Sequence, residues 1–189
     1  MLRDLVFRNR SYRRFYQEVP IDGETLRQLV DLGRLSASGA NRQPLKYWLS
    51  CDPATNALIF PCLAWAGYLT DWPGPVEGER PSAYILILCD TEVAPSAGVD
   101  HGIAAQSILL GATEKGYGGC IIASIRKDDL RQALSIPPRY DILLVLALGK
   151  PKEVVQVDPV GADGDIKYWR DPAGVHHVPK RALDDIILP

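Results

Sequence analysis

The chain contains 189 residues, of which 47% are hydrophobic and 23% are charged, and its formal net charge is −2. A chain of this size can bury a core of its own, so we expect one domain over residues 1–189. The acidic balance argues against a nucleic-acid-binding protein, and apolar runs such as residues 142–149 are too short to cross a bilayer.

The N-terminus lacks the basic segment and apolar run of a secretory signal, which predicts a cytoplasmic protein. No two cysteines have CxxC spacing, and three of the four lie in apolar runs that are typical of strands. In a reducing compartment we expect buried free thiols rather than disulfides. The cysteines are Cys51, Cys62, Cys89 and Cys120.

Helical periodicity marks five segments of the chain. Asp22 is a good N-cap for the second segment, and Pro61 disturbs the third. The fourth segment is the longest and is rich in small residues, and Gly116 supplies its C-cap. The five predicted helices span residues 2–8, 20–35, 54–69, 99–115 and 127–136.

Apolar runs between turn signals predict four strands, of which the last is apolar on both faces and therefore central. Segments 36–44 and 71–81 are loops by composition. Beyond residue 150 the chain is rich in loops, with a possible hairpin around residues 171–174 and a last short element at 181–188. The predicted strands span residues 46–51, 82–90, 119–125 and 140–149.

The order of these elements predicts an α+β fold with a mixed or mostly antiparallel sheet, because helices and strands do not alternate strictly. A dinucleotide-binding fingerprint is excluded, since GYGGCI at 116–121 follows a helix and lacks the third glycine. His176 and His177 are adjacent and face opposite sides of an extended segment, which argues against a shared metal. His101 opens a helix and is expected to form a local hydrogen bond.

The segment RNRSYRRF at residues 8–15 places four arginines in eight positions. One interpretation is a solvated helix end, because basic residues favour helix C-termini and charge runs are usually solvated. The other is a phosphate site, because arginine forks match phosphate oxygens and Ser11 adds a hydroxyl donor.

The same segment resembles a motif of a known family. RNRSYRRF, followed by a helix and then by SASGANRQP at 36–44, resembles the N-terminal pair of motifs in the nitroreductase family of FMN-dependent oxidoreductases. Residues 100–125 are similar to that family's long central helix and following strand. VPKRALDDII at 178–187 resembles the family's basic residue and short closing strand, so the resemblance covers nearly the whole chain.

The resemblance implies a nitroreductase-like α+β fold and an intertwined homodimer with two FMN sites at its interface. It implies that one group of residues binds the FMN phosphate and ribityl chain, with Arg13 reaching either the phosphate or the pyrimidine edge of the ring. Either Lys180 or Arg181 would close the phosphate site. The implied N-terminal group is Asn9, Arg10, Ser11 and Arg13.

The resemblance further implies that the 36–44 loop comes from the partner subunit and meets the flavin ring and ribityl chain. Ala37 replaces a common proline of the family, and Leu45 replaces a common tryptophan. The strand after the long helix would pass the dimethylbenzene and N5 side of the flavin. The implied loop residues are Ala37, Ser38, Gly39, Asn41 and Gln43, and the implied strand residues are Ile122, Ala123 and Ser124.

The implied activity is the reduction of small nitroaromatic, quinone or other acceptors by NAD(P)H, with ping-pong hydride transfer through FMN. No catalytic side chain and no metal are implied, because the hydride chemistry belongs to the cofactor. Tyr68 and Trp72 fall where relatives carry variable elements over the flavin, and aromatic rings can stack on a flat acceptor. The alternative for the 71–81 loop is a plain surface connection.

Two other classes of function stay open. One is a different flavin reaction, such as dehalogenation or dehydrogenation, and the other is a non-enzymatic dimeric protein that keeps the fold without the flavin. The helix at 99–115 is compatible with a buried dimer helix and with an ordinary core helix, because composition alone does not separate an interface from a core.

Overall fold

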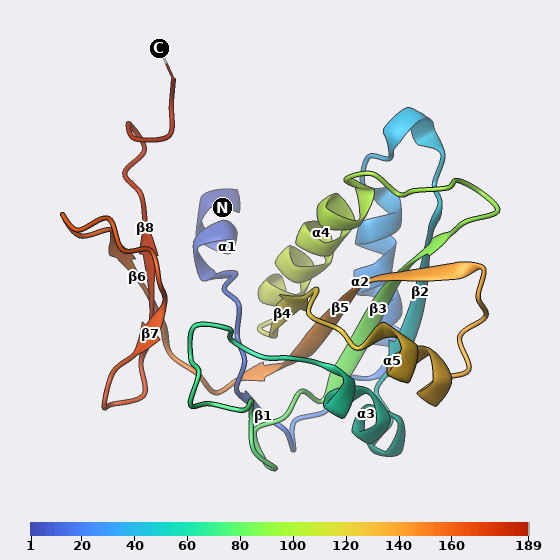
Figure 1. Cartoon of the computed structure of the whole chain (residues 1–189), viewed down its shortest axis with the longest axis horizontal. Helices are drawn as coiled ribbons and strands as arrows, with labels where there is room; N and C mark the ends of the chain where they lie inside the picture. The colour runs from blue at the N-terminus through green and yellow to red at the C-terminus, as the bar shows by residue number, and fades with distance from the viewer. Residues whose placement is uncertain (189) are drawn as a thin grey trace.

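The structure is a computed structural model that describes residues 1–188, and its centre in this range is a five-stranded sheet (Figure 1). The strand order is β1-β5-β3-β2, and β4 also pairs with β5. Every neighbouring pair is antiparallel. The strands are β1 (Phe15–Tyr16), β2 (Leu45–Ser50), β3 (Ala83–Asp90), β4 (Gly118–Ile122) and β5 (Tyr140–Pro151).

Helices cover both faces of this sheet, so the body has three layers (Figure 1). All eight residues of β3 are buried, and alternate side chains point to opposite faces. Ile85 and Ile87 pack in the core under α2 (Gly23–Leu35) and α4 (Asp100–Glu114). Tyr84, Leu86 and Leu88 pack in the second core, under α3 (Pro53–Ile59) and α5 (Lys127–Ala133).

The helix ends follow the predicted signals. The side chain of Asp22 accepts a hydrogen bond of 2.6 Å from the Thr25 N–H, which caps α2. Gly116, with φ +78°, ends α4, and the Tyr117 N–H returns to the Ala112 carbonyl at 2.8 Å. This is a Schellman ending, in which only glycine adopts the left-handed conformation without strain.

The predicted helix at 54–69 is wrong in its second half. The α-helix α3 ends at Ile59, and a 3₁₀ turn at Phe60–Cys62 follows, because Pro61 has no N–H to continue the helix. The chain then runs beside the end of β4, where Leu63 pairs with Ile125 and the Ala64 N–H donates to the Ser124 carbonyl at 2.9 Å. After Pro61, Cys62, Leu63 and Trp65 therefore pack in the second core, and residues 64–67 line a cleft at the end of β4.

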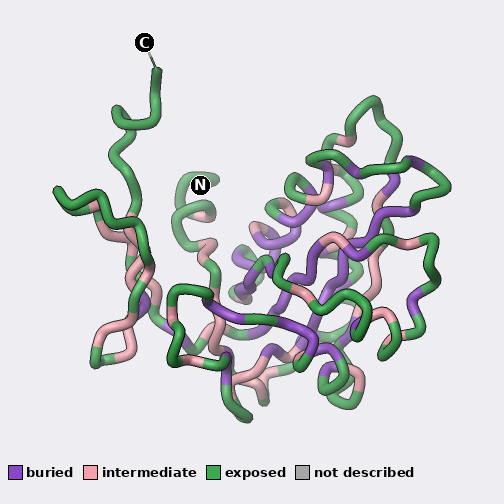
Figure 2. Tube along the Cα trace, in the orientation of Figure 1, coloured by how far each residue is buried: buried purple, intermediate pink, exposed green. Residues whose placement is uncertain are grey.

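A second, three-stranded sheet lies beside the N-terminal segment (Figure 1). It contains β6 (Val155–Pro159), β7 (Trp169–Arg170) and β8 (His176–Lys180), with β6 parallel and β7 antiparallel to β8. The predicted hairpin at 171–174 is confirmed, since β7 and β8 are joined by a turn in which Gly174 has φ +83°. The predicted closing element at 181–188 is absent as helix or strand in the described chain, and all of these residues are exposed (Figure 2).

The remaining predictions agree with the structure to within a few residues, and the α+β class is confirmed. The N-terminal helix α1 (Leu2–Arg8) buries none of its side chains (Figure 2). Within residues 1–188 no helix is both long and apolar enough to span a bilayer. All four cysteines are free, but Cys51 is exposed rather than buried, because it lies just past the end of β2.

Candidate functional site

The N-terminal segment passes from β4 to β5 between Ser11 and Phe15. Ser11 pairs with Gly119, whose carbonyl accepts from the Tyr12 N–H at 3.0 Å, whereas Phe15 pairs with Pro151 at the end of β5. A Cβ on Gly118 would lie 2.5 Å from the Tyr12 ring, so this close crossing requires glycine. Arg13 lies in the middle of the crossing.

A cavity of about 300 Å³ opens beside this crossing. Its walls come from the N-terminal segment and from β8 with the loop before β7, so the two ends of the chain meet here. It contains five of the residues predicted for the phosphate end, together with three that were not predicted. The eight lining residues are Asn9, Arg10, Ser11, Arg13, Tyr168, His176, Val178 and Lys180.

The four arginines of the N-terminal segment separate into two kinds. Arg8 pairs with Asp4 at 3.0 Å, and Arg14 forms a two-pronged pair with Glu79 at 2.6 and 2.7 Å. The guanidinium groups of Arg10 and Arg13 have no carboxylate partner among residues 1–188. The segment therefore presents two uncompensated guanidinium groups to one cavity, which is the arrangement that binds an anion.

None of the contacts of the Arg13 guanidinium neutralises its positive charge. Its Nη1 lies 3.2 Å from Nε2 of His176 and donates to the Ser11 carbonyl at 3.2 Å. The guanidinium carbon lies 4.9 Å from the centre of the Tyr168 ring. Its backbone N–H donates to Glu153 Oε2 at 2.9 Å.

His176 is a buried neutral imidazole in this wall. The pKa of His176 is lowered to about 4, chiefly by burial and in part by the nearby Arg13 and Arg170, while Glu153 opposes the shift. The ring is therefore uncharged at neutral pH and accepts from Arg13 at Nε2, which puts its proton on Nδ1. In the described chain neither this Nδ1 nor the buried Nε of Arg10 has a hydrogen-bond partner. Two buried donors in the walls of the cavity are thus free for a ligand.

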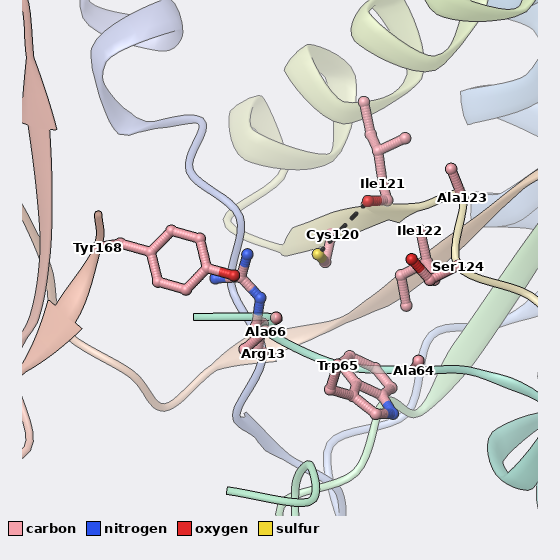
Figure 3. A pocket seen from close by; sticks show the side chains of 11 residues that line it. Arg13, Ala64, Trp65, Ala66, Cys120, Ile121, Ile122, Ala123, Ser124 and Tyr168 are labelled. Carbon is pink, nitrogen blue, oxygen red and sulfur yellow. Dashed lines mark hydrogen bonds between the residues drawn. The ribbon is translucent and has the colours of Figure 1, made fainter. Parts of the chain in front are cut away.

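A second cavity of about 210 Å³ is adjacent to the first, because Arg13 and Tyr168 line both. Figure 3 shows this second cavity. It lies between the end of β4 and the extended segment that follows Pro61, with Trp65 on that segment. The predicted residues Ile122, Ala123 and Ser124 are in its wall, as Figure 3 shows. A charged cavity beside a slot lined largely by small and apolar residues suits a flat ligand with an anionic tail.

The predicted 36–44 loop lies elsewhere. In Figure 1 it is beside the start of α4, separated from α1 by α4 and α2. The carboxylate of Asp100 fixes the loop by accepting from Ser38 Oγ at 2.6 Å and from the Gly39 N–H at 2.9 Å. Ala37, Ser38 and Gln43 line a separate cavity of about 140 Å³, and Gly39 and Asn41 are exposed. Within one chain, the structure does not bring this loop to the cleft.

The three remaining predicted positions differ in their surroundings. Tyr68 is exposed at the cleft, and its ring centre lies 4.9 Å from that of Tyr168. Trp72 packs against the core and supports the guanidinium of Arg170, 4.6 Å from its ring centre. Lys180 lines the charged cavity, whereas Arg181 is exposed just beyond it.

Sequence reasoning missed Glu153, Tyr168 and His176, all from the loop-rich region after residue 150. From the sequence, His176 was considered only as a metal ligand. Adjacent residues of an extended segment face opposite sides, so the pair His176–His177 also predicts one buried ring and one ring on the outer side. His177 indeed bonds Asp158 at 2.6 Å on the other side of β8. His101 was expected to form a local hydrogen bond, but its Nδ1 is buried without a partner in the described residues.

Comparison with known proteins agrees with this geometry. The nitroreductase family model matches residues 87–150. An NADPH-flavin oxidoreductase of Vibrio harveyi is 24% identical over an alignment of 174 positions, which covers 82% of this chain and 68% of that protein.

Solved structures show the same fold. A nitroreductase family protein of Streptococcus pneumoniae TIGR4 superposes with a TM-score of 0.71 at 17% identity, covering 100% of both chains. An FMN-dependent nitroreductase of Clostridium difficile R20291 superposes at 0.66 and 22% identity, covering 79% of this chain and 87% of that one. The fold is the nitroreductase fold, and the predicted resemblance to the nitroreductase family is confirmed.

Proposed function

We propose that this chain is an FMN-dependent NAD(P)H oxidoreductase of the cytoplasm that reduces small nitroaromatic or quinone acceptors by ping-pong hydride transfer. The observation that carries the proposal is the pair of adjacent cavities. Arg10 and Arg13, without carboxylate partners in the described chain, face one cavity with Lys180, and Arg13 and Tyr168 are shared with the slot at the end of β4. The printed names of the relatives, an NADPH-flavin oxidoreductase and an FMN-dependent nitroreductase, support this assignment.

The residues present fit a flavin mononucleotide. The charged cavity offers guanidinium groups, the Ser11 hydroxyl, Lys180 and two buried donors without partners to a terminal phosphate. The slot offers Ala66 on one side and Ile122 to Ser124 on the other to a flat ring. Arg10, Arg13 and Lys180 would hold the phosphate, and the slot would exclude water from the ring. The flavin supplies the hydride chemistry when bound, so no protein acid or base is required.

We infer that a second copy of the chain completes the site. The 36–44 loop does not reach the cleft of its own chain, yet Asp100 fixes it and it carries unusual backbone. Ala40, Asn41 and Gln43 all have φ between +51° and +54°, which is uncommon for residues with side chains and is concentrated at functional loops. A homodimer would place this loop over the partner's flavin. Tyr68, exposed at the mouth of the slot, would stack on a flat acceptor.

The first experiment is the absorbance spectrum of the purified protein, followed by titration of the apo protein with FMN. We expect flavin bands, quenching of flavin fluorescence and a raised melting temperature with FMN. Oxidation of NADH or NADPH in the presence of menadione or a nitroaromatic then tests the reaction. An FMN-binding protein without this oxidation would be assigned to another flavin reaction, such as dehalogenation or dehydrogenation. A protein without FMN affinity would be a non-enzymatic member of the fold.

A further inference from the structure

We propose that Glu153 is a positioning residue that directs Arg13 into the charged cavity. This inference rests on the proposed function, because it concerns the same FMN site. Glu153 follows β5 by two residues and its carboxylate is buried, with no exposed side-chain surface. A buried carboxylate beside several arginines would ordinarily pair with the nearest guanidinium. Glu153 does not pair with the guanidinium of Arg13.

Glu153 binds the backbone of Arg13 and leaves its side chain alone. The Arg13 N–H donates to Glu153 Oε2 at 2.9 Å. This N–H lies at the crossing between β4 and β5, where neither strand supplies an acceptor. The Lys152 N–H donates to the Arg14 carbonyl at 3.0 Å, so the segment after β5 binds the peptide groups that precede Arg13 and follow Arg14. The direction in which the Arg13 side chain leaves the backbone is therefore set by residues 152 and 153.

A different arginine neutralises the Glu153 charge. Arg170 Nη2 donates to Glu153 Oε1 at 2.6 Å, and the Arg170 side chain is only 16% exposed. The guanidinium of Arg170 packs on the face of the Trp72 ring, with 4.6 Å between the guanidinium carbon and the ring centre. Because each carboxylate oxygen already has a partner, Glu153 does not draw the Arg13 guanidinium out of the cavity. Arg13 Nη1 instead meets the uncharged His176 and the Ser11 carbonyl, so its positive charge remains available to an anion.

The adjacent Arg14 shows the opposite arrangement. Its guanidinium is taken by both oxygens of Glu79, which also pairs with Lys152 at 3.0 Å. Two neighbouring arginines thus meet two carboxylates in two ways, one through the side chain of Arg14 and one through the backbone of Arg13. Only the second way leaves a guanidinium for a ligand, and this contrast supplies a matched control.

The test is a double-mutant cycle on FMN affinity, measured by fluorescence quenching of FMN titrated into the apo full-length chain. If Glu153 acts through Arg13, Glu153→Ala raises the Kd for FMN about tenfold when Arg13 is present, and less than twofold in the Arg13→Ala background. A merely structural role would give equal losses in both backgrounds, and that result would overturn the proposal, as would an unchanged Kd in the single variant. Glu79→Ala is the matched control and should show no coupling to Arg13.

Glu153→Gln replaces Glu153→Ala in the cycle if circular dichroism shows that the alanine variant is unfolded. In glutamine an NH2 donor replaces one of the two oxygens, so the acceptor for either the Arg13 N–H or Arg170 is lost. The same dependence of the FMN affinity loss on Arg13 is expected. Wild-type protein that binds no FMN would instead contradict the proposed function. The two failures are therefore distinguishable. Failure of the Glu153 proposal requires a wild type that binds FMN and a cycle without coupling.

Discussion

Arg13 and Arg14 are neighbours in the chain, yet their guanidinium groups serve different surroundings. Arg14 binds both carboxylate oxygens of Glu79, at 2.6 and 2.7 Å, and thereby fastens the 71–81 loop to the N-terminal segment. Arg13 lies under the ring of Tyr168 and lines both cavities of the cleft. The basic segment is therefore neither wholly a solvated surface nor wholly a binding site.

Arg14→Ala should lower the free energy of unfolding by about 2 kcal/mol, because it removes two charge-assisted hydrogen bonds and leaves Glu79 with Lys152 as its remaining basic partner. Urea unfolding of the apo protein measures this loss. Arg34→Ala is the control, since Arg34 forms an exposed pair with Asp31 that should contribute less than about 0.5 kcal/mol. Equal losses for the two variants would contradict a structural role for Arg14.

Arg13→Ala should weaken FMN binding by about 1.5–3 kcal/mol, the range for a charge-assisted hydrogen bond, which is roughly a tenfold to hundredfold rise in Kd. The free energy of unfolding of the apo protein should change little, because the Arg13 guanidinium forms no ion pair with a carboxylate in the described chain. Titration of FMN fluorescence measures the affinity. Arg8→Ala removes an arginine of the same segment whose partner is Asp4, and its Kd should stay within twofold of the wild type. If Arg8→Ala weakened FMN binding as much as Arg13→Ala does, the net charge of the segment alone would determine the affinity.

Acid should weaken the Glu79 contact in a defined window. The hydrogen bond from Arg14 lowers the pKa of Glu79 from 4.5 to about 2, and Lys152 adds to this effect. Between these values the unfolded chain binds the proton and the folded chain does not, so the free energy of unfolding falls as pH falls from about 4.5 to about 2. Urea unfolding at pH 6, 4 and 3 should therefore show a shallower decline for Glu79→Gln than for the wild type. Parallel declines would count against this ion pair.

The two adjacent histidines should affect stability with opposite signs. Burial lowers the pKa of His176 to about 4, whereas the hydrogen bond to Asp158 raises the pKa of His177. As pH falls from 6.5 toward 4, this histidine binds a proton in the unfolded chain but stays neutral in the folded one. His176 therefore lowers the free energy of unfolding in acid. His177 contributes stability below 6.5 and loses it as pH rises through its raised pKa.

Melting temperatures of His176→Gln and His177→Gln, each relative to wild type between pH 5 and 8, measure this difference. As pH falls, the relative melting temperature should rise for the first variant and fall for the second. The same slope in both variants would contradict the assignment of one buried and one paired ring.

Local sequence signals predicted most of the fold, and the family resemblance named five of the eight residues that line the charged cavity. The caps at Asp22 and Gly116 are local contacts, and the buried strands were evident as apolar runs. The prediction failed after Pro61, because residues that face a cleft and residues that face a core are equally apolar. It missed Glu153 and His176 because their contacts with Arg13 join positions 140 and 163 residues apart, in a region without periodicity.

The charged cavity takes its walls from Asn9 to Arg13 and from Tyr168 to Lys180, so it joins the two ends of the chain. A growing polypeptide on the ribosome can pair β2, β3, β4 and β5 before the last β8 residues are made, but it cannot yet close this cavity. Contacts so distant in sequence also form late in folding, because the long loop between them must close first. Capture of the flavin would consequently wait until β8 has been made, and a chain cut before His176 would keep its central sheet while losing the cofactor.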